Sequence, residues 1–158
     1  MSDDKKLKQA QVAFKTLCEM LDSNGWRYNK DEKNLVINCS ARGEDLPMEL
    51  KIEIDVDRML IVLLSPMPFL VSEERRIALA VATSVANYRL ADGSFDYDMR
   101  SGRILFRMTS SFRDSLIGKD LFEYMLFVSC KTIDDFNDKF LTISKNNAST
   151  EEIIKFLS

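Results

Sequence analysis

The sequence has 158 residues, of which 46% are hydrophobic and 30% charged, which are proportions typical of a globular domain. Its 22 Lys and Arg residues against 25 Asp and Glu residues give a net charge of −3, so no basic surface for nucleic acid is indicated. The chain contains no His, which removes the commonest general base and the commonest transition-metal ligand. We therefore expect a protein that is not an enzyme, with no catalytic residue, no cofactor and no metal site.

Three cysteines, Cys18, Cys39 and Cys130, are widely spaced and lie among apolar residues, which predicts three reduced core thiols. The first residues are charged and lack the apolar stretch of a signal peptide. The longest apolar run, Met59–Leu64, is far shorter than the ~20 residues that a membrane helix needs. We expect a cytoplasmic protein without membrane contact. We also expect one domain over residues 1–158, with 145–158 as a short C-terminal helical extension.

The first third of the chain predicts a helix followed by two strands. The helix runs from about Asp4 to Asn24, and the Gly that follows is a stop signal. Short strands are expected at residues 26–29 and 34–41, with a polar turn between them and a loop at 42–47. The expected buried face of the helix consists of Leu7, Phe14, Leu17, Cys18 and Leu21.

The next segment gives the clearest strand pattern. Apolar and charged residues alternate strictly over Met48–Val56, which indicates one buried and one charged face. After a tight turn, the strand Met59–Leu64 is apolar on both faces. Either it is central and covered on both sides, or another subunit covers one side. Residues 65–71, which include Pro66 and Pro68, are expected to link this strand to the next helix.

A helix is predicted from Ser72 to about residue 91. Ser72 is a suitable N-cap, and the two Glu residues that follow it suit the helix dipole. Apolar residues recur at helical spacing and predict a single buried stripe. This stripe consists of Ile77, Val81, Val85 and Tyr88.

A β-hairpin follows the helix. Alternation predicts strands at residues 95–98 and 103–108, with a loop at 99–102 in which Gly102 can adopt a positive φ. The expected register pairs Tyr97 with Ile104 and places Asp98 opposite Arg103. Leu105 is then the one apolar residue on a charged outer face.

Three short patterns in this region, Asn87–Leu90, Gly93–Asp98 and Gly102–Ile104, resemble the YbjN family. The shared features are an Asn at the helix end, a Gly-x-Phe strand start and an acidic turn closed by Gly, and the resemblance extends over roughly residues 7–145. It implies a fold similar to the type III secretion chaperones, which have one antiparallel sheet with helices on one face and are often dimeric. It implies no enzymatic activity.

The C-terminal part is predicted to be helical after a polar crossover at residues 109–118. Apolar residues at spacings of three and four run from Phe122 to Ile143, as the core face of a packed helix or as a coiled-coil seam. Thr132 resembles a second N-cap, so this segment is either one helix or two helices broken near Lys131. A capping box at 149–152 opens a short terminal helix.

Charged clusters are the remaining candidates for chemistry. The acids Asp55, Asp57, Asp96 and Asp98 lie at hairpins and lack the spacing of a calcium loop. We interpret them as solvated turn residues rather than as a metal or acid–base site. The arginines are interpreted as partners of neighbouring acids rather than as an anion site. They are Arg100, Arg103, Arg107 and Arg113.

Taken together, the patterns predict an α+β fold with a single antiparallel β-sheet of five to six strands, helices on one face and the order α-ββββ-α-ββ-α. The predicted function is a non-enzymatic cytosolic protein-binding, chaperone-like or regulatory module. It is expected to form a homodimer, and a polypeptide client is the further partner considered. The alternative is a regulator that binds a small ligand between helix and sheet. Binding is expected on the exposed face or edge of the sheet, because an apolar strand face and an open edge both favour association. The candidate contact residues are Leu60, Val62, Leu64, Leu105, Arg103 and Arg107.

Overall fold

The structure is a computed structural model that describes residues 3–158. Its elements follow one another in the predicted order. They are α1 (Asp3–Ser23), β1 (Tyr28–Asp31), β2 (Val36–Arg42), β3 (Pro47–Asp55), β4 (Leu60–Leu70), the 3₁₀ turn η1 (Glu73–Arg75), α2 (Arg76–Arg89), β5 (Ser94–Asp98), β6 (Arg103–Ser111), α3 (Lys119–Lys145) and α4 (Thr150–Leu157).

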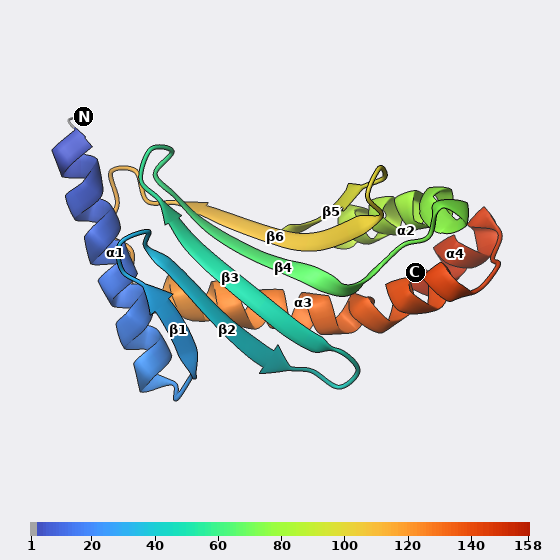
Figure 1. The fold of residues 1–158 in the computed structure, drawn as a ribbon, viewed down its shortest axis with the longest axis horizontal. Helices are drawn as coiled ribbons and strands as arrows, with labels where there is room; N and C mark the ends of the chain where they lie inside the picture. Colours follow the sequence, from blue (N-terminus) through green and yellow to red (C-terminus); the bar gives the residue numbers. More distant parts are fainter. Residues whose placement is uncertain (1–2) are drawn as a thin grey trace.

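The strands form one antiparallel sheet in the order β1-β2-β3-β4-β6-β5. The helices lie on one side of this sheet, and the long helix α3 crosses behind it (Figure 1). The predicted α+β fold is thus confirmed, with six strands. The sheet therefore has one face covered by helices and one open face.

Alternating burial along the strands defines the two faces of the sheet. In β3, Met48, Leu50, Ile52 and Ile54 are buried, and the charged residues between them point the other way. In β4 the burial pattern is the same, although every residue of the strand except Ser65 is apolar. This strand is central in the sheet, but none of the helices formed by residues 3–158 covers its second face, so about half of its apolar side chains lie on the open side.

The face that α2 buries differs from the prediction. Ile77 is 69% exposed and Tyr88 93% exposed, and Val81 and Val85 are only half-buried. The sequence places these residues in the core because they recur at helical spacing. In the structure the buried face of α2 consists mostly of small residues, and small side chains let a helix lie close to the elements packed against it. The residues that are buried are Leu79, Ala82, Thr83 and Ala86.

Regular structure continues through a segment predicted to be a link and through a point where the sequence left a helix break open. Strand β4 continues through Pro66 and Pro68 to Leu70, where the sequence predicted a link, and its pairing with β6 shifts register between Pro66 and Leu70. Such an irregularity accommodates residues that cannot donate a backbone hydrogen bond. Helix α3 also runs unbroken past Lys131, because its apolar stripe continues on one face and buries Ser129 in its gap.

The helix ends were predicted with mixed success. The capping box at the start of α4 is present, since Ser149 accepts from the backbone N–H of Glu152 and Glu152 accepts from that of Ser149. Ser72 precedes η1 rather than α2 and makes no side-chain capping bond. In α1, Leu7 is exposed and Cys18 half-buried. The residues that α1 buries are Ala10, Ala13, Phe14, Leu17, Met20 and Leu21.

The β5–β6 hairpin has the predicted register, with Tyr97 opposite Ile104 and Asp98 opposite Arg103. Gly102 closes the turn with φ +75°. The helix α2 holds this hairpin through Asn87, whose side-chain oxygen accepts from the Phe95 backbone N–H at 2.7 Å and whose amide donates to the Phe95 carbonyl at 3.0 Å. Asn87 thus has a direct structural role, because its side chain satisfies the backbone N–H and carbonyl of Phe95 in the edge strand β5.

Replacing Asn87 by Ala is expected to lower the free energy of unfolding by about 1–3 kcal/mol, because two backbone groups of Phe95 lose their partners. Urea denaturation measures this change. Asn87→Asp retains the acceptor and loses the donor, so an intermediate loss is expected. Ser84→Ala, an exposed change on the same helix, serves as the control. A loss below about 0.5 kcal/mol for Asn87→Ala would contradict the role assigned to this residue.

Candidate functional site

The open face of the sheet carries the predicted contact residues. Leu60, Val62 and Leu64 of β4 and Leu105 of β6 point to this face, and all four are half-buried between longer neighbours. We call these four residues the apolar stripe. The structure therefore brings them together on one surface, as the sequence-derived registers required.

Charged residues flank the apolar stripe in an ordered way. Along β3, Asp55 and Glu53 lie opposite Leu60 and Val62, and Lys51 lies opposite Leu64. On the β6 side, Arg107 lies opposite Leu64. One end of the stripe thus carries acids and the other carries bases, and within the chain Lys51 pairs with Glu53, Arg58 with Asp55 and Arg107 with Asp96.

The two arginines predicted to neighbour the stripe, Arg103 and Arg107, have different surroundings from each other. Arg107 forms an ion pair with Asp96, with 2.6 Å between Nε and Oδ2. Arg103 is exposed on the same face, opposite Asp98 in the register. Asp98 instead accepts from Arg100 and from the Ser101 hydroxyl. These contacts agree with the interpretation of the hairpin charges as turn and sheet-surface pairs.

The hairpin acids are held by their own turns. The Ser101 hydroxyl, together with the Arg100 backbone N–H, lowers the pKa of Asp98 below its ordinary value. Burial alone would raise the pKa of Asp55, but hydrogen bonds from the Arg58 backbone and guanidinium outweigh it and lower that pKa. Within residues 3–158 no three His, Cys, Asp or Glu side chains are grouped so that they could hold a metal ion.

All three cysteines are free thiols. Cys39 is buried and Cys18 and Cys130 are half-buried. Burial raises the pKa of the Cys39 and Cys130 thiols to about 11. The thiol form therefore predominates at neutral pH, and this form is not the nucleophile.

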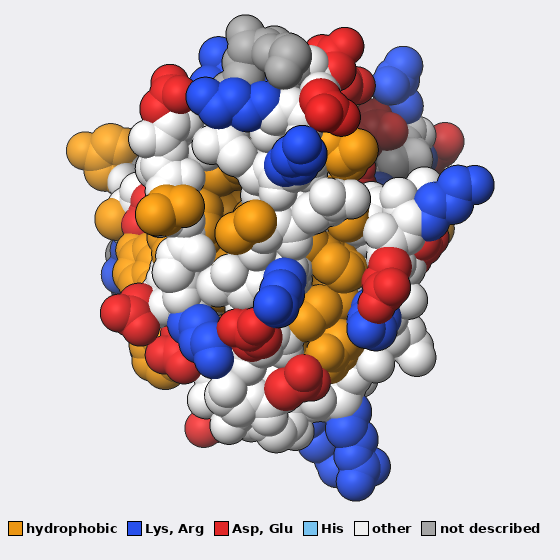
Figure 2. Space-filling model, turned by 90° about the vertical axis from the view of Figure 1, so that its left-hand side faces the viewer, with side chains coloured by type: hydrophobic (Ala, Val, Ile, Leu, Met, Phe, Trp, Pro, Cys, Tyr) orange, Lys and Arg blue, Asp and Glu red, His pale blue; other side chains and the backbone are white. Residues whose placement is uncertain are grey.

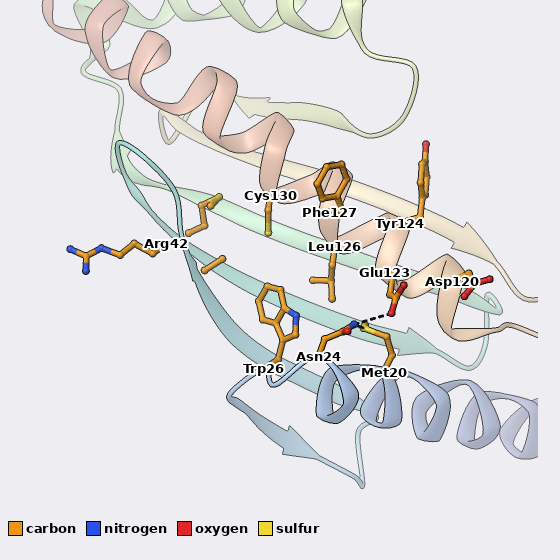
Figure 3. A pocket seen from close by; sticks show the side chains of 12 residues that line it. Met20, Asn24, Trp26, Arg42, Asp120, Glu123, Tyr124, Leu126, Phe127 and Cys130 are labelled. Carbon is orange, nitrogen blue, oxygen red and sulfur yellow. Dashed lines mark hydrogen bonds between the residues drawn. The ribbon is translucent and has the colours of Figure 1, made fainter.

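A second surface, which the sequence did not predict, is an apolar groove of about 750 Å³ on the helical side. Helix α1 and the residues after it form one wall, the first three turns of α3 form the other, and the ends of β2 and β3 form the floor (Figure 3). Its lining residues are Met20, Asn24, Trp26, Ala41, Arg42, Met48, Asp120, Glu123, Tyr124, Leu126, Phe127 and Cys130.

Hydrogen bonds between distant segments fix the shape of this groove. At one end, the Asn24 amide donates to the Glu123 carboxylate at 2.9 Å and joins the end of α1 to α3 (Figure 3). Towards the other end, the Asp134 carboxylate accepts from the Glu44 backbone N–H at 3.0 Å and holds the β2–β3 loop against α3. The walls are therefore tied to one another independently of any occupant.

Aromatic side chains form much of the groove and reach the solvent at its rim. Phe127 is 69% exposed and Tyr124 is 46% exposed, with its hydroxyl donating to Asp92. Both fall outside the buried stripe of α3, and this was the available sequence signal, because large apolar residues on the polar side of an amphipathic helix indicate a contact surface. Exposed apolar residues also occur on α1, and Figure 2 shows hydrophobic patches between charged side chains at that end of the molecule.

None of the helices formed by residues 3–158 combines the length and apolar character of a membrane span. One six-stranded antiparallel sheet with helices on one side makes this an α+β protein. The chain belongs to the YbjN family, described as "Putative bacterial sensory transduction regulator", whose family model matches residues 14–142. No curated protein matches the sequence.

Two solved structures share the fold. The structure described as "YbjN, a putative transcription regulator from E. coli" is 15% identical, with a TM-score of 0.59 over 77% of this chain and 85% of that one. A structure of the HopA1-SchA chaperone-effector complex is 11% identical, with a TM-score of 0.56 over 82% of this chain and 95% of the matched chain. At these identities the likeness shows the fold alone.

Proposed function

We propose that this protein is a cytosolic, non-enzymatic protein-binding module of chaperone-like or regulatory type, and that two copies associate through the apolar stripe. The observation that carries the proposal is the open face of the sheet, where Leu60, Val62, Leu64 and Leu105 form a contiguous surface without a covering helix. Contiguous apolar surface of this kind is typical of interaction sites.

A face-to-face dimer with two-fold symmetry would bring opposite charges together at the ends of the stripe. A two-fold axis that lies between the two sheets, parallel to them and perpendicular to the strands, and that passes over Val62 would place Leu60 of one copy over Leu64 of the other. Asp55 would then face Lys51 of the second copy. A surface that is complementary to itself is the requirement for a symmetric dimer.

The open face of the sheet is also large enough for a stable dimer interface. The six strands contain 45 residues, which at about 3.3 Å per residue and about 4.8 Å between strands give a face on the order of 700 Å². Two such faces together bury about 1,400 Å², within the range of about 1,200–2,000 Å² for stable interfaces.

Binding of a polypeptide client is the second proposed use of the open face. It is supported by the description of the family as a regulator and by the likeness to a chaperone that was solved with its effector.

The double variant Val62→Glu with Leu105→Glu is expected to weaken the dimer by at least about 100-fold, because burying unpaired carboxylates costs several kcal/mol. Light scattering should change from twice the 18.2 kDa chain mass to that mass, while the melting temperature is retained. Loss of an identified partner from a pull-down, with the dimer intact, would instead indicate a client site. No effect on either, or a wild-type protein of one chain mass at high micromolar concentration, would contradict self-association through the stripe.

The alternative of a small-ligand regulator would use the groove, since its volume of about 750 Å³ falls in the range of about 300–1,000 Å³ for ligand pockets. The groove is open to solvent, however, and its rim carries the exposed ring of Phe127. An exposed aromatic rim favours a polypeptide, which covers it, over a small molecule, which does not. Protein binding therefore remains the proposed function.

A further inference from the structure

We infer that the groove between α1, the floor of β2 and β3, and α3 is a docking site for an amphipathic helix of about three turns from a partner protein. This inference rests on the proposed protein-binding function and gives it a second, separate surface. The apolar stripe lies on the open face of the sheet, whereas the groove lies on the helical side.

The apolar lining provides the contact surface for such a helix. Trp26 lies on the α1 side, and Leu126 projects from α3 toward it into the space between the two walls, whereas the exposed ring of Phe127 stands at the rim on α3 (Figure 3). Met20 and Met48 add flexible side chains that adapt to different occupants. Aromatic and Met side chains around a hydrophobic groove are the usual means by which proteins bind the apolar face of a helix.

The dimensions of the groove match a helix rather than a single side chain. The α3 wall extends from Asp120 to Cys130, a length of about 15 Å at 1.5 Å per residue. A partner helix of about eleven residues has that length, and its positions i, i+3, i+4 and i+7 would face the groove.

The charges at the ends of the groove define which helix fits. Asp120 and Glu123 stand at one end, and Arg42 stands at the other with its guanidinium turned outward (Figure 3). Within residues 3–158, neither Asp120 nor Arg42 makes an ion pair. A complementary helix therefore carries a basic residue at the end that meets Asp120 and Glu123, and an acidic residue at the end that meets Arg42.

The test uses the fluorescence of Trp26, which is the only Trp in the chain and lines the groove. The probe is a synthetic twelve-residue peptide with Leu or Phe at positions 2, 5, 6 and 9, Lys at one end and Glu at the other. We expect a saturable change in Trp26 emission. Phe127→Glu should weaken binding by at least tenfold, whereas Ile77→Glu should leave it unchanged, because Ile77 is equally exposed but lies on α2.

Two peptide controls separate helix docking from adhesion to any apolar surface. The same peptide with a central Pro loses its helix, and a version with Ser at the four apolar positions loses its apolar face. Both should fail to bind. The inference is overturned if the Pro peptide binds equally well, if Phe127→Glu has no effect, or if only a small apolar dye binds in a manner sensitive to Phe127→Glu. The last result would assign the groove to small ligands.

Failure here is distinguishable from failure of the proposed function. The variant Val62→Glu with Leu105→Glu should bind the probe peptide as the wild type does, because the stripe and the groove lie on opposite sides of the sheet. If that variant loses its dimer while Phe127→Glu changes no peptide binding, the proposed function stands and the groove inference falls. If the peptide binds and the stripe variant changes nothing, the reverse holds.

Discussion

Replacing Leu79 by Ala is expected to lower the free energy of unfolding by about 2–5 kcal/mol, the usual loss for a large-to-small change in a packed core. Leu79 is fully buried on the face by which α2 packs against the rest of the protein. Its neighbours on that face are small or short, so no larger side chain can fill the space that it leaves. Chemical denaturation followed by circular dichroism measures this loss.

The matched control is Ile77→Ala, two residues away on the same helix. Ile77 is 69% exposed, so its truncation should change the free energy of unfolding by no more than about 0.5 kcal/mol. The helical pattern of the sequence predicts the opposite ranking, because it places Ile77 in the core. Equal losses for both variants, or a larger loss for Ile77→Ala, would show that the packing of α2 is not the one described.

Gly102→Ala is expected to have the second large effect, a loss of about 3 kcal/mol or more. At φ +75° any other residue pays about 1–2 kcal/mol for the left-handed conformation. A Cβ at this position would also lie 2.2 Å from the Val71 carbonyl oxygen. This contact is with backbone and cannot be relieved by a side-chain rotation. The Val71 backbone N–H also donates to the Gly102 carbonyl at 2.9 Å, so relief by separation would strain that bond.

Gly25→Ala isolates the conformational part of this loss. Gly25 has a similar φ of +71°, but a Cβ there would meet no atom within 4 Å. We therefore expect a loss of only about 1–2 kcal/mol, and the difference between the two variants measures the steric contact with Val71. Thermal or urea unfolding provides both values. A Gly102→Ala protein as stable as Gly25→Ala would mean that the β5–β6 turn does not approach Val71 as closely as described.

Local signals determined much of the fold. The capping box at 149–152, the β5–β6 register and the strict alternation of β3 all depend on residues close in sequence, so their chemistry could be predicted directly. The apolar stripe follows from the same registers, because a strand with a known partner has a known face. Its place on the open side of the sheet was therefore predictable, whereas its use in binding stays a proposal.

The groove could not be predicted in this way. The sequence pattern predicts Trp26 as part of a strand and assigns no role to Phe127. These two residues are about a hundred positions apart, and the packing of α1 against α3 brings them together, with Asn24 and Glu123 fixing the contact. No local sequence pattern predicts this packing of α1 against α3, since it depends on the angle at which the two helices diverge over the sheet.

The sequence by itself determined the order of the elements, the alternation of β3 and the β5–β6 register, because side-chain periodicity and turn chemistry act over a few residues. Only the tertiary structure decided which face of α2 is buried. Large residues at 77 and 88 and smaller ones at 82 and 86 both follow helical spacing. The buried face combines one large side chain, Leu79, with the smaller Ala82, Thr83 and Ala86, and small side chains let neighbouring elements pack close to the helix.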